Sequence, residues 1–208
     1  MKAISRIAAA LAVIVLLGAP SFAILKPGAK LVPFSLKNVD GRDYTVTMEE
    51  GKLTVIVAET VGGETKTVKS HPAAVLVDFW ATWCVPCRKA MPHMQQLSET
   101  YRPAEGGTEG GLIVLGIALD EAGGKVVIPF YRKLKITYPM LADAPSSAAP
   151  GLSATAKDMK KSYDVQEIPV VYLIDSTGTI THAHIGFKES HIAELDAAVK
   201  ALVGAGAK

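Results

Sequence analysis

Cys84 and Cys87 are the two cysteines of the 208-residue chain, and only Val85 and Pro86 separate them. They lie where an apolar run gives way to a predicted helix over residues 86–101. At the first turn of a helix, unpaired backbone N–H groups and the positive end of the helix dipole stabilise a thiolate. Cys87 follows three residues later on the same helix face, within reach of a bond to Cys84. The pair therefore predicts thiol–disulfide exchange, in which Cys84 attacks a substrate disulfide and Cys87 resolves the mixed disulfide.

Other uses of a cysteine pair fit the sequence less well. A zinc site needs four ligands, and the chain has no second cysteine pair but five scattered histidines: His71, His93, His182, His184 and His191. Since His182 and His184 alternate along a predicted strand, we expect them to be exposed. Covalent haem attachment needs a histidine after the second cysteine, where Arg88 stands. A disulfide across so short a loop removes little chain entropy, which argues against a structural bridge.

Two further chemistries use one or both thiols. A peroxiredoxin-type peroxidase carries the pattern Pro-x-x-x-Thr-x-x-Cys, and this chain has Val77 and Ala81 where the pattern needs Pro and Thr. A metallochaperone that binds Cu(I) through both thiolates stays open, because thiolates are soft ligands. We expect no resident metal and no cofactor besides the redox-active Cys84–Cys87 disulfide itself.

Asp78 is the one charged residue in the apolar run 73–80, a run typical of a central strand covered on both faces. Burial of a lone carboxylate is unfavourable, so we expect a raised pKa for Asp78. The residue stands six positions before Cys84, and we expect it to project beneath the dithiol and accept the proton of Cys87. The alternative is a solvated aspartate at the edge of a sheet.

The elements that position these residues follow an α/β order. Residues 24–72 are rich in strand-forming residues, with hairpin signals at Asp40-Gly41 and Gly62-Gly63. The predicted strands that follow are 73–80, 112–119, 170–174 and 179–185, and the predicted helices are 86–101, 125–134, 156–163 and 190–203, the last with Ser190 as N-cap and Gly204 as its stop. This order predicts an α/β fold with a mixed central sheet flanked by helices.

Residues 1–23 have the layout of a secretory signal peptide, with a basic start, an apolar run over residues 7–17 and small residues before a cleavage site. Residues 7–25 are just long enough to span a bilayer, so an uncleaved N-terminal anchor in the inner membrane is the alternative. Both interpretations export the folded part of the chain to the periplasm or another extracytoplasmic space.

The charge balance argues against a nucleic-acid partner. Lys and Arg number 22 and Asp and Glu 20, which gives a formal net charge of +2. Both signs are scattered along the chain, whereas nucleic-acid binding needs a clustered basic surface. Removal of residues 1–23 takes away Lys2 and Arg6 and leaves a formally neutral chain.

The chain resembles the thioredoxin superfamily most clearly over residues 77–89, which read Val-Asp-Phe-Trp-Ala-Thr-Trp-Cys-Val-Pro-Cys-Arg-Lys. Weaker matches follow in order at Ile168-Pro169, Tyr172-Leu173-Ile174-Asp175, Gly178 and Ile185-Gly186. The most similar group is the TlpA/ResA-type exported thiol–disulfide oxidoreductases. The resemblance covers about residues 27–45 and 73–203 and implies a thioredoxin-like fold with an N-terminal β-hairpin extension.

Three parts of the chain are expected on this basis. Residues 1–23 form the signal peptide or anchor, residues 24–72 the N-terminal β extension, and residues 73–208 the thioredoxin-like domain. The segment 46–70 resembles an insertion in the extension.

The resemblance also implies a substrate groove. It implies a cis peptide bond at Ile168–Pro169 that faces the cysteines, with the Ile168 backbone free to pair with an extended substrate segment. Trp83, Pro86 and the pair Ile185-Gly186 are expected to border the same groove.

The chain departs from the TlpA/ResA pattern at two positions. Asp78 occupies the thioredoxin position, where TlpA/ResA-like proteins more often carry Asn. Ala90 stands where many of them have Glu.

The function implied is thiol–disulfide exchange on exported proteins. A reductase in an oxidising compartment has to be recharged across the membrane, and the resemblance implies a DsbD/CcdA-type membrane electron donor. It further implies a role in the maturation of cytochrome c or of copper sites. An oxidase or isomerase is the alternative within the same class.

Overall fold

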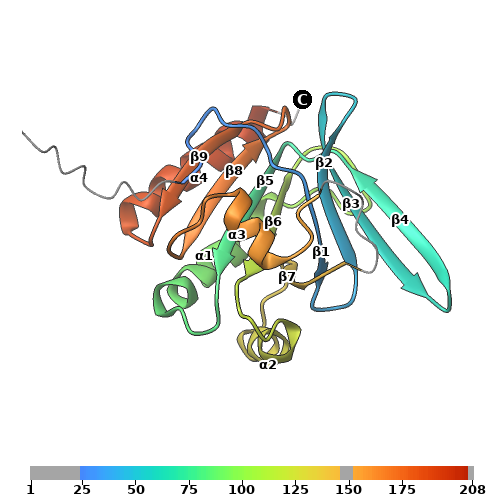
Figure 1. Ribbon diagram of the computed structural model, residues 1–208. Helices are drawn as coiled ribbons and strands as arrows, with labels where there is room; N and C mark the ends of the chain where they lie inside the picture. The colour runs from blue at the N-terminus through green and yellow to red at the C-terminus, as the bar shows by residue number, and fades with distance from the viewer. Residues whose placement is uncertain (1–23, 146–151, 206–208) are drawn as a thin grey trace, which may run out of the picture.

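The computed structural model describes residues 24–145 and 152–205 (Figure 1). Its strands form one nine-stranded mixed sheet in the order β4-β3-β2-β1-β7-β6-β5-β8-β9. The strands are β1 (Phe34–Asn38), β2 (Asp43–Glu49), β3 (Lys52–Val61), β4 (Glu64–Ser70), β5 (Ala74–Trp80), β6 (Leu112–Ala118), β7 (Met140–Asp143), β8 (Val170–Asp175) and β9 (Ile180–Ile185). The helices are α1 (Val85–Tyr101), α2 (Gly124–Leu134), α3 (Ala156–Ser162) and α4 (Glu189–Ala205). The α/β thioredoxin-like fold with a mixed sheet flanked by helices is confirmed.

The N-terminal strands β1 to β4 form an antiparallel meander that extends this sheet. The turn between β3 and β4 is Gly62-Gly63, and both residues have positive φ (62° and 87°), as a tight hairpin with the twist of its strands requires. β1 joins the rest of the sheet through antiparallel pairing with β7. The β3–β4 hairpin ends the sheet on that side and stands away from the helices (Figure 1).

The centre of the sheet is β5, which pairs in parallel with β6 and antiparallel with β8. Alternate side chains of β5 enter two apolar clusters on opposite faces. One cluster joins Leu76 and Trp80 to α1 and α4, and the other joins Val77 and Phe79 to α3 and the N-terminal strands. α1 and α4 cover the first face and α3 lies on the second (Figure 1). The sheet is therefore buried on both faces where β5 ends at the cysteines.

Three details of the predicted elements were wrong. Strand β7 was not predicted, because four residues are too few to show a periodic pattern and the strand is defined by its pairing with β1 at Asn38 and with β6 at Gly116. Ser190 is inside α4 and is not its N-cap: the first turn closes on the Lys188 carbonyl, which accepts the N–H groups of His191 and Ile192. Gly204 likewise lies within the helix.

Within residues 24–145 and 152–205, none of the helices has the length and apolar character to cross a membrane. The predicted signal peptide or anchor at residues 1–23 lies outside the described residues.

Candidate active site

The two cysteines form a disulfide at the start of α1. Cys84 is the N-cap residue, and its Sγ accepts the backbone N–H of Cys87 at 3.2 Å. This is the contact that an N-cap side chain makes with the third residue of a helix. Pro86 is the second helical residue, where a missing N–H leaves no hydrogen bond unmade. The local sequence therefore places Cys84 Sγ where a backbone donor and the helix dipole stabilise negative charge.

Both sulfur atoms are nearly covered. Cys84 is 4% exposed and Cys87 1%. Both belong to the core cluster that includes Met91. Since Cys84 is the more exposed of the two, an incoming disulfide reaches it first. This geometry fits the predicted roles of an attacking and a resolving thiol.

Asp78 lies in the middle of β5, opposite Gly116 of β6 and Val171 of β8. The pairing on both sides places it in a central strand and not at the edge of the sheet. Asp78 is two positions from both Leu76 and Trp80, so its side chain lies on the same face of the strand as theirs. That face is the one that α1 and the cysteines cover. Asp78 is 1% exposed, and its Oδ1 has no hydrogen-bond partner among the described residues.

Burial raises the pKa of Asp78 to about 7. A buried carboxylate without a compensating donor is disfavoured in its charged form, which is the cause of this shift. At neutral pH the group can take up a proton or release one. Its use by Cys87 stays a prediction.

The Ile168–Pro169 peptide bond is cis and faces the disulfide. The Ile168 carbonyl oxygen lies 3.8 Å from Cys84 Sγ, and since a disulfide sulfur carries no hydrogen this is a contact in the oxidised form. On the other side of the loop, the Gly186 N–H donates to the Pro169 carbonyl at 2.7 Å. The structure thus brings the cysteines, the cis-proline loop and Gly186 together, as expected.

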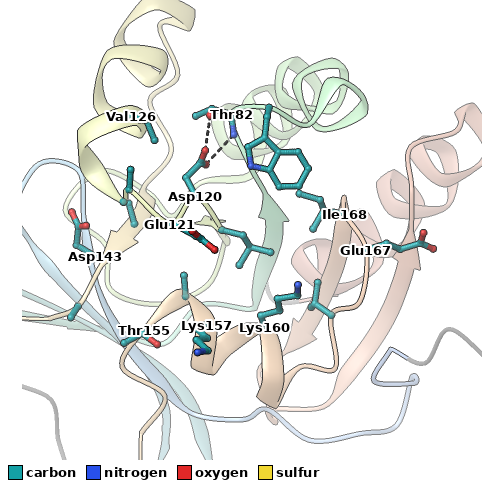
Figure 2. Close-up of a pocket in the computed structure, with 18 of the residues that line it drawn as sticks. Thr82, Asp120, Glu121, Val126, Asp143, Thr155, Lys157, Lys160, Glu167 and Ile168 are labelled. Atoms are coloured by element: carbon teal, nitrogen blue, oxygen red, sulfur yellow. Dashed lines mark hydrogen bonds between the residues drawn. The ribbon is translucent and has the colours of Figure 1, made fainter.

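A groove of about 1410 Å³ begins beside Trp83 and Ile168 and runs to α3 (Figure 2). Trp83 is 68% exposed and forms an apolar rim at this end. The remaining groove residues proposed from the sequence, Pro86, Pro169, Ile185 and Gly186, lie outside its lining. Ile185 instead packs against the second core cluster.

Sequence reasoning missed the far wall of the groove. This wall is formed by α3, which carries Lys157 and Lys160, and it lies across the groove from the loop that follows β6, which carries Asp120 and Glu121 (Figure 2). These residues come from segments far apart in the chain, so no local pattern joins them. The one available signal is the position of Asp120 just beyond the carboxyl end of a buried strand, where sites of α/β sheets concentrate.

Asp120 anchors the loop that leads to Cys84. Its Oδ1 accepts the Thr82 hydroxyl at 2.6 Å, and its Oδ2 accepts the Thr82 backbone N–H at 3.0 Å (Figure 2). Asp120 is 8% exposed, so these hydrogen bonds to its carboxylate are largely shielded from solvent. Hydrogen bonds to a carboxylate are stronger than those between neutral groups. Thr82 and its neighbour Trp83 are therefore fixed beside the disulfide.

The expectation that His182 and His184 are exposed was wrong: His184 is buried and His182 is half-buried. The face of β9 that carries both residues packs against α4, and the sequence pattern alone did not show that this helix covers it. Nowhere in the described part of the chain do three or more His, Cys, Asp or Glu side chains converge to hold a metal ion.

These features define a class: the fold and the dithiol are those of the thioredoxin-fold thiol–disulfide oxidoreductases. Residues 58–183 match the AhpC/TSA family, and the chain belongs to that family. The peroxidase pattern is absent from its sequence, as noted above for Val77 and Ala81.

Named relatives agree with the class. The chain is 29% identical over 129 residues to the thioredoxin-like protein YneN of Bacillus subtilis, which covers 62% of this chain and 66% of that protein. It is 24% identical over 132 residues to sporulation thiol-disulfide oxidoreductase A of Bacillus subtilis (64% and 71%). It is also 24% identical over 153 residues to the thiol-disulfide oxidoreductase ResA of Geobacillus thermodenitrificans (74% and 66%). The chain thus spans about two thirds of the length of these relatives.

Solved structures share the fold. A thiol:disulfide interchange protein of the thioredoxin family from Chlorobium tepidum superposes with a TM-score of 0.52 at 23% identity, over 88% of this chain and 100% of that one. StoA from Bacillus subtilis superposes with a TM-score of 0.50 at 19% identity, over 82% and 98%.

Proposed function

We propose that the protein is a reductase of disulfide bonds in exported proteins. The observation that carries the exchange chemistry of this proposal is the position of Cys84 Sγ, which accepts the Cys87 N–H at the start of α1 and lies against the Ile168 carbonyl. A sulfur held in this way can exist as a thiolate and is the one that an incoming disulfide meets first.

The reaction starts from the dithiol form. The Cys84 thiolate attacks a substrate disulfide, so that a Cys84–substrate bond forms and the first substrate thiolate leaves. Cys87 then gives its proton to Asp78 and attacks Cys84 Sγ. The Cys84–Cys87 disulfide forms, the second substrate thiolate leaves, and two electrons have passed to the substrate. Asp78 later releases its proton to solvent.

Asp78 also supports the direction of electron flow. A carboxylate buried on the face of the dithiol, with no donor on its Oδ1 among the described residues, opposes the negative charge of a thiolate. Destabilising the thiolate-containing reduced form favours the disulfide and lowers the reduction potential. Stabilisation of the reduced form is what makes DsbA an oxidant, and Asp78 acts in the opposite sense.

The wider role follows from the expected export of the chain. A reductase outside the cytoplasm needs a source of electrons, and we assign this role to a DsbD/CcdA-type membrane protein. The products of the reductase are thiols in other exported proteins, such as the thiols that receive haem in cytochrome c maturation or copper in copper-site assembly. The backbone at Ile168 pairs with an extended substrate segment, and Trp83 lies beside that segment.

Trapping of the mixed disulfide tests the proposal. The reduced Cys87→Ser variant is expected to hold disulfide-bonded insulin, or an unfolded protein with its disulfides intact, in a stable mixed disulfide, whereas Cys84→Ser is expected to hold none. The wild-type chain is expected to catalyse insulin reduction by dithiothreitol. Equal capture by the two variants, or no insulin reduction by the wild type, would contradict the proposed function.

A further inference from the structure

Four of the five histidines gather on the helix-covered face of β9. His182 and His184 lie on β9 itself, with His182 Nε2 and His184 Nδ1 3.2 Å apart. The rings of His184 and His191, the latter from α4, have centroids 4.6 Å apart. His93 of α1 also faces His184. We call these four residues the histidine cluster.

A chain of hydrogen bonds connects this cluster to the cis-proline loop. His191 Nδ1 lies 3.2 Å from the Gly186 carbonyl oxygen. Since a carbonyl only accepts, His191 Nδ1 carries the proton and donates it. The N–H of the same Gly186 donates to the Pro169 carbonyl at 2.7 Å. The neighbouring Ile168 carbonyl contacts Cys84 Sγ.

We propose that His191 is a positioning residue for the substrate-binding loop at Ile168–Pro169, and that the histidine cluster makes this positioning weaken in acid. The proposal rests on the proposed function, because that function assigns the loop to substrate binding.

The acid sensitivity follows from the packing of the cluster. A hydrogen bond between His182 and His184 needs one ring nitrogen without a proton. Burial, together with the facing His191, His182 and His93, lowers the pKa of His184 to about 3. Burial and His191 also lower the pKa of His182, and Glu194 acts in the opposite sense.

Few opposite charges face the cluster. From α4, Glu194 faces His182, and Asp196 lies 3.3 Å from His93 Nε2. Because the packing disfavours protonation of His182 and His184, a fall in pH favours a state in which these two rings are released from it. In that state the first turn of α4 moves away from β9, and His191 leaves the Gly186 carbonyl.

The first test compares two reactions of the reduced protein. The rate of reaction with the disulfides of insulin depends on the loop, whereas the rate with the small disulfide 5,5′-dithiobis(2-nitrobenzoate) does not. The ratio of the two rates cancels the effect of Cys84 ionisation. His191→Phe keeps the ring and loses the donor, so we expect this ratio to fall about tenfold at pH 7.5, the effect of one hydrogen bond. His191→Asn keeps an N–H donor and is expected to retain the ratio within about threefold. His71→Gln is the control, since His71 is bonded to Thr54 elsewhere.

The same ratio tests the acid response. In the wild type we expect it to fall several-fold between pH 7.5 and pH 5, and to fall less in His191→Asn, which lacks one of the facing imidazoles. A wild-type ratio that does not change with pH, or a His191→Phe variant with the wild-type ratio, would overturn the proposal.

Amide hydrogen exchange of the wild type provides a second test. It needs no variant to fold, and it does not depend on enzyme activity. The protection of the Gly186 N–H in the wild type is expected to fall at pH 5 relative to that of Leu119, whose N–H donates to Trp80 at 2.8 Å. Unchanged relative protection would contradict the proposal. If the wild type reduces no protein disulfide but Gly186 loses protection in acid, the proposed function fails and the positioning by His191 stands.

Discussion

Two buried aspartates lie within or just beyond the neighbouring strands β5 and β6, and they differ in their hydrogen-bond partners. Asp78, on β5 beneath the helix that carries the cysteines, has an Oδ1 without a donor among the described residues. Asp120, in the loop after β6, has a donor on each oxygen, both from Thr82. Burial raises the pKa of Asp78 to about 7. The same residue type is thus left without a donor on one oxygen in one place and serves as an anchor in the other, and we predict that the first acts as a proton acceptor.

The difference arises from what the backbone offers at each site. In the middle of a sheet, the N–H groups around Asp78 are committed to ladder bonds with β6 and β8. At the end of β6, the loop after Trp80 turns and leaves the Thr82 N–H and hydroxyl free to donate. A carboxylate beyond a strand end can therefore be satisfied as an anion, whereas one within the strand is held ready for a proton.

The largest expected effect concerns stability and pH. Because the pKa of Asp78 is raised from 3.8 to about 7 in the folded protein, its contribution to folding is most favourable below pH 4 and is lost as pH rises to 7. The loss amounts to about 4 kcal/mol at most. Asp78→Asn is expected to remove this pH dependence and to unfold at a higher urea concentration than the wild type at pH 7.5. Equal midpoints for the two proteins at pH 4.5 and pH 7.5 would show that the two carboxylates do not differ in this way.

The next effect concerns the rate of the reaction. In Asp78→Asn, Cys87 has no proton acceptor, so resolution of the mixed disulfide is expected to slow by about 10²-fold near pH 7. Stopped-flow measurements between pH 6 and pH 9 follow this step. Rates that match the wild type across that range would remove the proton-acceptor role from Asp78.

Asp120→Ala should act in the opposite way to Asp78→Asn. It leaves two donors of Thr82 without their acceptor, and we expect the free energy of unfolding to fall by about 2 kcal/mol. The pH dependence of the resolution step is expected to stay that of the wild type. A changed pH dependence in this variant would mean that Asp120 also exchanges protons with the dithiol.

The smallest effect tests the anchor from its other end. Thr82→Val removes the hydroxyl and keeps the backbone N–H, so the expected loss is about 1.5 kcal/mol, near the lower end for a hydrogen bond to a charged group. Thr82→Ser keeps the hydroxyl and serves as the matched control. Thermal unfolding of both variants measures the difference, and similar melting temperatures would show that the hydroxyl bond contributes nothing.

The contrast between the two carboxylates also explains what could be predicted from the sequence. The spacing of Cys84 and Cys87 and the position of Asp78 within an apolar run are local patterns. All three residues are buried in the structure, as these patterns predict. The helix start at the cysteines follows from the same short segment. Local sequence therefore predicted the order of the elements apart from β7, and the position of the cysteine pair at the start of a helix.

The missed features depend on pairings between distant segments. Asp120 and Thr82 are separated by 38 positions, and β7 exists through its bonds to β1 and β6. His184 was expected to be exposed because its strand alternates, but α4 covers it. Such coverage depends on how helices pack on the sheet, and a single sequence carries no period or spacing that reports it.

The reduction potential of the Cys84–Cys87 pair tests the central claim most directly, when measured at pH 7 against glutathione for the wild type and Asp78→Asn. With a buried carboxylate that opposes the thiolate, the wild-type potential is expected to lie nearer to the thioredoxin value of about −270 mV than to the DsbA value of about −120 mV. The potential of Asp78→Asn is expected to be less negative than that of the wild type. A wild-type potential near that of DsbA, with no change in the variant, would contradict the account.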